Sequence, residues 1–213
     1  MTMPLFELTS FELLARQNGY RYIAGLDEAG RGPLAGPVVA AAVILPPDYH
    51  HPEINDSKQL SPKKREKLYD LIRCDALAVG VGVIESTVID AVNILRASLM
   101  AMREAIQELR PAPDFLLVDG RHRVPISLPQ KTIIHGDARS ISIAAASIIA
   151  KVSRDQIMEI YHRQFPQYNF LKNKGYGTGE HRLAIERFGT CKIHRKSFHT
   201  KDSRQTSYEF ILS

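Results

Sequence analysis

The stretch Gly25-Leu26-Asp27-Glu28-Ala29-Gly30-Arg31-Gly32-Pro33 is the one around which this chain is expected to fold. It begins in an apolar strand predicted over residues 22–26, and two adjacent carboxylates appear where that strand is expected to end. Such an acidic pair suits a hard divalent cation, because Mg²⁺ and Mn²⁺ prefer oxygen ligands. The glycines let a ligand approach main-chain N–H groups, and the arginine offers a planar fork for phosphate. From this stretch alone, a metal and phosphate site and a charged turning loop are equally good interpretations.

Two further aspartates follow apolar runs in the same way. Asp119 comes directly after the run 115–118, and Asp137 comes shortly after the run 131–134. In an α/β sheet, residues that leave the carboxyl ends of neighbouring strands converge on one edge, where ligands bind. Each acid alone is most often a turn residue or a helix cap, and Asp137 could cap the helix that follows it. Together with Glu28 they predict one pocket, in which four carboxylates would repel one another unless cations were present.

The rest of the chain alternates predicted strands and helices as far as about residue 165, which indicates an α/β fold with a largely buried sheet. The apolar run 38–45 predicts a central strand, and the valine- and glycine-rich run 76–84 predicts an edge strand. Apolar residues at steps of three and four predict the longest helix from Thr87 to the prolines at 111 and 113. Thr9 and Glu12 have the spacing of a capping box for a helix over 10–17. Further helices are expected over residues 61–73, 138–164 and 180–188.

The composition is that of a globular protein with a basic surplus. The chain has 213 residues, a formal net charge of +5 and a pI of about 9.2, which favours a polyanionic partner. Its cysteines, Cys74 and Cys191, stand far apart, which argues against a disulfide framework or a zinc site. The sequence shows neither a signal peptide nor an apolar run that could span a bilayer, so we expect a cytoplasmic protein with no membrane partner.

The opening stretch, continued to Pro37, resembles the signature of bacterial ribonuclease HII, a type 2 ribonuclease H. Other segments resemble the same family and occur in the family's order from about Tyr22 to Phe198. These segments are DSKQL at 56–60, LVDG at 117–120, GD at 136–137, SIAAASIIAK at 142–151, KGYGT at 174–178 and HRKSF at 194–198. The resemblance implies a ribonuclease H-like α/β fold, a mixed central sheet flanked by helices, with a helical C-terminal extension. We expect a single catalytic domain over 1–213, with an α/β core over about 20–165 and the extension over about 166–213.

The resemblance also implies an activity and the residues that perform it. The expected enzyme hydrolyses the RNA strand of RNA–DNA hybrids and cuts 5′ of single ribonucleotides in duplex DNA, leaving 5′-phosphate and 3′-hydroxyl ends. It implies Mn²⁺ or Mg²⁺ as the cofactor in a two-metal mechanism. The acids implied as catalytic and metal-binding are Asp27, Glu28, Asp119 and Asp137. No obligate protein partner is evident, and we expect a monomer.

Substrate recognition is implied for a second set of residues. The segment Gly30-Arg31-Gly32 resembles the part of the family that reads the 2′-hydroxyl of the ribonucleotide, the group that separates RNA from DNA locally. Tyr176 resembles the aromatic residue that stacks on the sugar just after the RNA-to-DNA junction; without the family it would be an ordinary loop aromatic. Lys58 could contact a phosphate or simply be solvated, and Lys151 and Arg154 could equally form the wet face of their helix.

Two other functions remain open from the sequence. A nucleic-acid-binding module without catalysis fits the basic balance, but it leaves the acids unexplained and predicts binding that does not depend on metal. A nucleotide-binding enzyme with the glycine loop as its phosphate cradle is weaker, because neither G-x-x-x-x-G-K-[ST] nor a helix-opening G-x-G-x-x-G is present.

Overall fold

The structure, a computed structural model, describes residues 8–54 and 60–198. In this part of the chain, five strands form one sheet in the order β3-β2-β1-β4-β5. The strand β1 pairs antiparallel with β2 and parallel with β4, so the sheet is mixed, and β3 lies at an edge as predicted. The strands are β1 (Ile23–Ala29), β2 (Val38–Ile44), β3 (Ala78–Ile84), β4 (Phe115–Asp119) and β5 (Gln130–Ile133).

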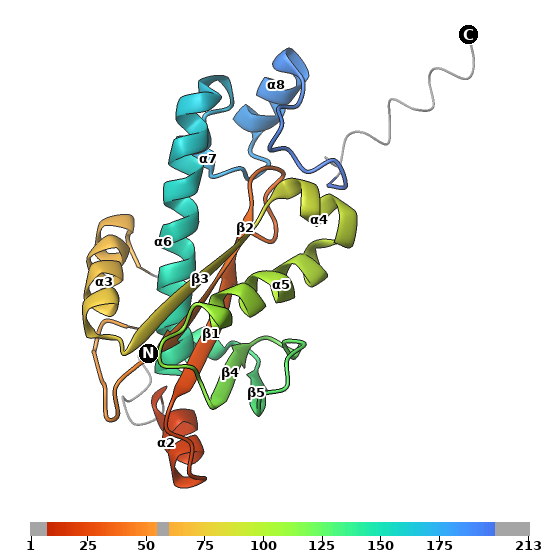
Figure 1. The fold of residues 1–213 in the computed structure, drawn as a ribbon. Coiled ribbons are helices and arrows are strands. Elements are labelled where there is room, and N and C mark those ends of the chain that lie inside the picture. Colours follow the sequence, from red (N-terminus) through yellow and green to blue (C-terminus); the bar gives the residue numbers. More distant parts are fainter. Residues whose placement is uncertain (1–7, 55–59, 199–213) are drawn as a thin grey trace.

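Helices cover both faces of this sheet, and a group of short helices follows at the C-terminal end of the longest one (Figure 1). The helices are α2 (Ser10–Gln17), α3 (Pro62–Asp75), α4 (Ser86–Val92), α5 (Ile94–Gln107), α6 (Ile141–Gln164), α7 (Phe170–Asn173) and α8 (Gly179–Phe188), with 3-10 turns η2 (Gly136–Ala138) and η3 (Pro166–Tyr168). The elements after α6 form the helical C-terminal region that the sequence indicated. None of the helices in the described ranges is sufficiently long and apolar to cross a membrane.

The central strand β2 shows why its sequence is apolar at every position. All seven of its residues are buried, because each face of the sheet is covered by helices. Val38, Ala40, Ala42 and Ile44 pack with α5 on one face, and Ala41 and Val43 pack with α3 and α6 on the other. The alternation of side chains along a strand therefore gives each helical layer its own hydrophobic core.

The contact between β1 and α6 is especially close. A Cβ atom at Gly25 would overlap the backbone of Ser142, so the helix lies directly on the strand. The run 144–146 is alanine only and is fully buried, which allows the same close approach further along α6. This packing sets the position of the residues of α6 that face the end of β1.

Two predicted boundaries are wrong in an informative way. The strand β1 continues through Asp27 and Glu28 to Ala29, because these residues pair with Ala41, Ala40 and Val39 of β2. The two acids therefore lie within a strand and point to opposite faces of the sheet. The predicted long helix is divided into α4 and α5 at Asn93, whose φ is 73° and whose side chain accepts from Arg96 N. The longest described helix is instead α6, with 24 residues.

Candidate active site

The pairing of β1 with β4 brings two of the predicted acids to the same level of the sheet. Leu26 pairs with Val118 in parallel register, so Asp27 and Asp119 follow at the same edge. Asp119 is the last residue of β4, whereas the sequence predicted it as the first residue after the strand, and Asp27 is 5% exposed within β1. The convergence that the strand exits indicated is therefore present for this pair.

A cleft of about 310 Å³ gathers most of the residues implied by the resemblance. Three of its lining residues are the carboxylates of Asp27, Glu28 and Asp119. The segment Gly30-Arg31-Gly32 and Tyr176 line the same cleft. Residues from β1, the loop after it, β4 and the loop before α8 thus surround one space, although they are up to 149 positions apart in the chain.

The carboxylate of Asp27 is held in an unfavourable environment for a negative charge. Burial raises its pKa well above the ordinary value, and the negative charges of Glu28 and Asp119 raise it further. Hydrogen bonds from the side chain of Ser147 and from the backbone N–H of Glu28, at 2.7 Å, lower the pKa and oppose this shift. A divalent cation at this position would reverse the balance and favour the ionised carboxylate.

Glu28 faces a positive charge from its own loop. Its Oε1 lies 2.9 Å from Nη1 of Arg31, an ion pair in which the glutamate side chain is 10% exposed and the arginine side chain is 48% exposed. Glu28 also lies with Asp119 beside α5, in a smaller pocket that includes Ser98 and Leu99. The guanidinium of Arg31 thus offsets part of the negative charge of these acids, as a bound cation would.

Asp137 is the predicted acid that the cleft does not include. It is 4% exposed in the turn η2, and it is absent from the residues that line the cleft. It is nevertheless attached to the site, because the N–H of the preceding Gly136 donates to Oδ1 of Asp119 at 2.7 Å. Lys58, the predicted phosphate contact, lies outside the described residues.

The acidic side chains of the cleft fit divalent cations, although they do not form a complete coordination sphere. Within residues 8–54 and 60–198, no three His, Cys, Asp or Glu side chains are grouped closely enough to hold a metal ion as they stand. The fit rests on chemistry: carboxylate oxygens are the ligands of Mg²⁺ and Mn²⁺, and the repulsion among Asp27, Glu28 and Asp119 is what such ions would relieve.

Tyr176 stands beside the glycine-rich loop. Its residue is 46% exposed, so the ring is available to a ligand. A Cβ at Gly32 would lie 3.7 Å from Cε1 of Tyr176, which places the ring next to the Gly30-Arg31-Gly32 segment. The two loops are joined directly, because the N–H of Leu34 donates to the carbonyl of Gly175 at 2.8 Å.

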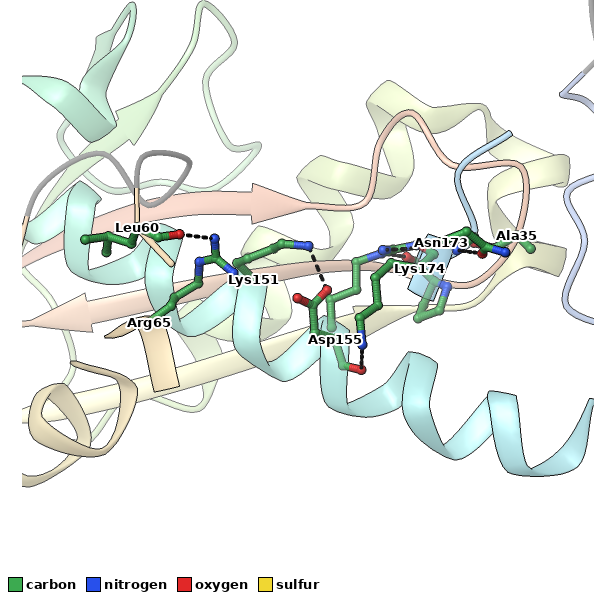
Figure 2. Close-up of polar contacts among 10 residues, drawn as sticks. Ala35, Leu60, Arg65, Lys151, Asp155, Asn173 and Lys174 are labelled. Atoms are coloured by element: carbon green, nitrogen blue, oxygen red, sulfur yellow. Dashed lines mark hydrogen bonds and ion pairs between the residues drawn. The ribbon is translucent and has the colours of Figure 1, made fainter. Parts of the chain in front are cut away.

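The structure adds polar residues of α6 to the cleft: Ser147, to which the sequence assigned no role, and Lys151 and Arg154, which it left as a possible solvent-exposed helix face. Ser147, Lys151 and Arg154 line the cleft and are spaced at steps of four and three, so they share one helix face. Lys151 donates to Asp155 at 2.7 Å, and Arg65 donates to the carbonyl of Leu60 at 2.9 Å (Figure 2). Burial lowers the pKa of Lys151, although Asp155 opposes this. The spacing of these three residues in the sequence shows that they share a helix face, but periodicity alone does not show which face of a helix lines a binding site.

Arg154 differs most from its expected place. The sequence left open a wet helix face for it, but the residue is 1% exposed. Its guanidinium donates to backbone carbonyls of Ala35, Pro37 and Lys174 and so lies beneath the cleft.

Comparison with known proteins gives a consistent result. The family model described as ribonuclease HII matches residues 24–201 of the chain. A ribonuclease HII of Syntrophus aciditrophicus (strain SB) is 69% identical over 201 residues, which cover 94% of this chain and 95% of the relative.

Solved structures share the fold. The ribonuclease H2 from Pyrococcus horikoshii OT3 has a TM-score of 0.71 at 24% identity and covers 90% of this chain and 99% of its own. Bst-RNase HIII, solved in complex with Mn²⁺, has a TM-score of 0.62 at 19% identity and covers 83% of this chain and 66% of its own.

Proposed function

The chain belongs to the ribonuclease HII family, which cleaves the RNA of RNA–DNA hybrids, and we propose that it also cuts duplex DNA on the 5′ side of a single embedded ribonucleotide. It is thus a ribonuclease H, a hydrolase. The observation that carries the finer proposal is the composition of one cleft, where three carboxylates, the Gly30-Arg31-Gly32 segment and Tyr176 meet.

The acids would hold the cofactor, for which we propose Mn²⁺ or Mg²⁺. Asp27 is the best candidate to bridge two ions, because both neighbouring carboxylates act on it. Glu28 and Asp119 would complete the inner ligands, with Asp137 joining from η2. Divalent cations bound there would lower the pKa of the attacking water and stabilise the leaving 3′-oxygen, so the products would carry 5′-phosphate and 3′-hydroxyl ends.

The loop residues would select the substrate. Arg31 and Gly32 are exposed, and within the described residues no hydrogen bond uses their backbone N–H groups, so these donors suit a 2′-hydroxyl or a phosphate oxygen. The ring of Tyr176 would pack on the following sugar, which fits best when that sugar lacks a 2′-hydroxyl. A single chain supplies all of these residues, so a monomer would suffice.

The test compares three duplexes of equal length: all-DNA, a long RNA–DNA hybrid, and DNA with one ribonucleotide. Each is incubated with the protein in Mg²⁺ or Mn²⁺, with and without EDTA. We expect the all-DNA duplex to stay intact and the other two to be cut only without EDTA, the third at one phosphate 5′ of the ribonucleotide. Cutting of the long hybrid alone would refute ribonucleotide recognition. Binding without metal-dependent cutting would favour the non-catalytic module.

A further inference from the structure

Two adjacent residues near the end of the described chain, His194 and Arg195, are connected to the two elements proposed to recognise the substrate. Arg195 contacts the Gly30-Arg31-Gly32 segment directly, and His194 is linked to Tyr176 through His181. His194 and Arg195 lie in a segment, residues 191–198, that crosses beneath the loop after β1. This C-terminal segment is joined to the loop by backbone hydrogen bonds, from Arg195 N to the carbonyl of Leu34 at 2.8 Å and from Gly36 N to the carbonyl of Ile193 at 2.9 Å. Both side chains are buried, at 5% and 2% exposure for His194 and Arg195.

The guanidinium of Arg195 donates all three of its described hydrogen bonds to backbone carbonyls of the loop, and its Cζ lies 4.9 Å from the ring centroid of Phe198. Its Nη2 donates to the carbonyl of Gly30 at 2.6 Å, its Nη1 to the carbonyl of Arg31 at 3.0 Å and its Nε to the carbonyl of Gly36 at 3.0 Å. Within the described part of the chain, no carboxylate lies within ion-pair distance of this group. A buried charge without a carboxylate partner is costly unless dipoles of this kind surround it. The three carbonyl groups are therefore kept pointing toward the guanidinium, in the interior of the protein.

These contacts determine where the amide groups of the loop point. In a trans peptide the C=O and N–H groups point in opposite directions, and the carbonyl of one residue shares its peptide with the N–H of the next. Turning the carbonyls of Gly30 and Arg31 inward therefore turns the N–H groups of Arg31 and Gly32 outward. These are the two donors proposed above to read the 2′-hydroxyl, and both residues are exposed.

Arg154 completes the arrangement from the side of α6. It donates to the carbonyls of Ala35 and Pro37, at 3.2 and 3.0 Å, and to the carbonyl of Lys174 at 3.0 Å; Ala35 and Lys174 are labelled in Figure 2. Gly30 has a φ of +96°, and a Cβ there would overlap the guanidinium of Arg154. Two buried arginine side chains, Arg195 and Arg154, thus support the loop. Glycine is required at position 30, where the loop passes over Arg154.

His194 reaches Tyr176 through a second histidine. Nδ1 of His181 lies 2.9 Å from the carbonyl of Tyr176, which only accepts, so Nδ1 carries the proton. In a neutral ring, Nε2 of His181 then accepts from Nε2 of His194 at 3.1 Å. Nδ1 of His194 is left to accept from the N–H of Cys191 at 2.9 Å. One arrangement of protons on two neutral rings therefore satisfies the whole chain of hydrogen bonds.

We propose that Arg195 and His194 are positioning residues for substrate specificity, which hold the Arg31 and Gly32 amides and Tyr176 at a fixed spacing. The inference rests on the proposed function, since it assumes that these two elements read a ribonucleotide and the deoxyribose that follows it. A long hybrid can bind in many registers, so an enzyme in which the spacing of these groups varies can still place a scissile phosphate in the cleft. A single ribonucleotide offers one register, so its cleavage depends on the spacing.

The experiment uses the full-length Arg195→Lys variant, which keeps the charge but cannot donate to three carbonyls from a fixed fork. The kcat and KM are measured on the long hybrid and on the duplex with one ribonucleotide. We expect kcat/KM on the single ribonucleotide to fall on the order of 10- to 100-fold more than on the hybrid, mainly through kcat. The matched control, Lys196→Met, removes an exposed charge from the next position and should leave the ratio of the two substrates unchanged.

Two additions separate positioning from general damage. Arg195→Ala should regain part of its activity on the single ribonucleotide when guanidinium is added at a concentration too low to denature the protein. His194→Gln interrupts the other contact and should shift the substrate ratio in the same direction, which keeps the test decisive if an Arg195 variant does not fold. Folded variants of both residues with an unchanged substrate ratio would overturn the inference alone. A wild-type protein that never cuts at single ribonucleotides would overturn the proposed function and this inference with it.

Discussion

Single side chains decide the electrostatics of the cleft, and Asp27 is the clearest case. Its carboxylate is buried next to two others, and Ser147 offsets part of the cost by a hydrogen bond. Ser147 has no carboxylate with which to bind a metal ion. Its hydrogen bond instead favours the ionised form of Asp27 and fixes the orientation of that side chain. Mutation of neighbours of this kind typically lowers metal affinity or activity by about 10- to 100-fold.

Replacing Ser147 by alanine should therefore weaken cation binding. We expect the Ser147→Ala variant to bind Mn²⁺ on the order of 10-fold more weakly in calorimetric titration, because Asp27 loses a hydrogen bond to its charged form. Ser153→Ala on the same helix is the control, since Ser153 does not line the cleft. Unchanged affinity in Ser147→Ala would exclude this role.

Tyr176 allows a second test with one side chain. Tyr176→Ala removes the ring that lies beside Gly32 and should lower kcat/KM at an isolated ribonucleotide on the order of 10-fold, with a smaller loss on long hybrids. The measurement is parallel kinetics on both substrates. Equal losses would show that the ring does not sense the RNA-to-DNA junction.

The elements show how far local sequence patterns extend. The apolar run of β2, the edge position of β3 and the convergence of Asp27 and Asp119 at one end of the sheet follow from hydrophobic pattern and strand order. The end of β1 does not, because Asp27 and Glu28 are poor strand formers that the alanines and valine of β2 keep in the ladder. Tertiary pairing overrides propensity at that point.

Long-range polar contacts are the part that local patterns miss. Thr9 and Glu12 have capping-box spacing, but Thr9 makes no side-chain cap bond, and Glu12 instead accepts from Ser140 Oγ and Ser142 N at the start of α6. In the same way, nothing in the motif around Arg195 shows that its guanidinium is buried under a loop more than 150 residues away in sequence. Such contacts become visible only when the elements are placed in space.

The close contact of α6 with β1 leads to a stability prediction. Gly25→Ala should lower the free energy of unfolding by about 3 kcal/mol, because the new Cβ overlaps the backbone of Ser142, which cannot rotate away. Urea denaturation measures this loss. Gly179→Ala is the control, since nothing lies within 4 Å of its Cβ position. A tolerated alanine at Gly25 would contradict the described packing.

At the scale of the whole molecule, the C-terminal region is attached to the α/β core through buried groups. His194 packs edge-on against Tyr168 and His181 packs edge-on against Phe170, both in that region, and Arg195 contacts the loop after β1. Burial lowers the pKa of His194 from 6.5 to about 4, with the charge of His181 the second cause, and burial also lowers the pKa of His181. Both rings are therefore neutral at pH 7.

This arrangement makes stability depend on pH in a defined window. Between pH 6.5 and about 4, the unfolded chain binds a proton at His194 that the folded chain does not, so stability falls as the pH falls. Above pH 6.5 this contribution is complete. Thermal unfolding across pH should show a shallower slope in His194→Gln than in the wild type. Identical slopes in His194→Gln and the wild type would contradict the buried neutral pair.

The most direct measurement of the central claim, that the converging carboxylates hold the cations for cleavage, uses Asp27→Asn. This change keeps the shape of the side chain and removes its charge. Cleavage of the duplex with one ribonucleotide is followed in Mg²⁺ and in Mn²⁺, beside binding of the uncut hybrid. We predict that cleavage is abolished while hybrid binding largely survives; near-normal turnover by Asp27→Asn in Mg²⁺ would contradict the account.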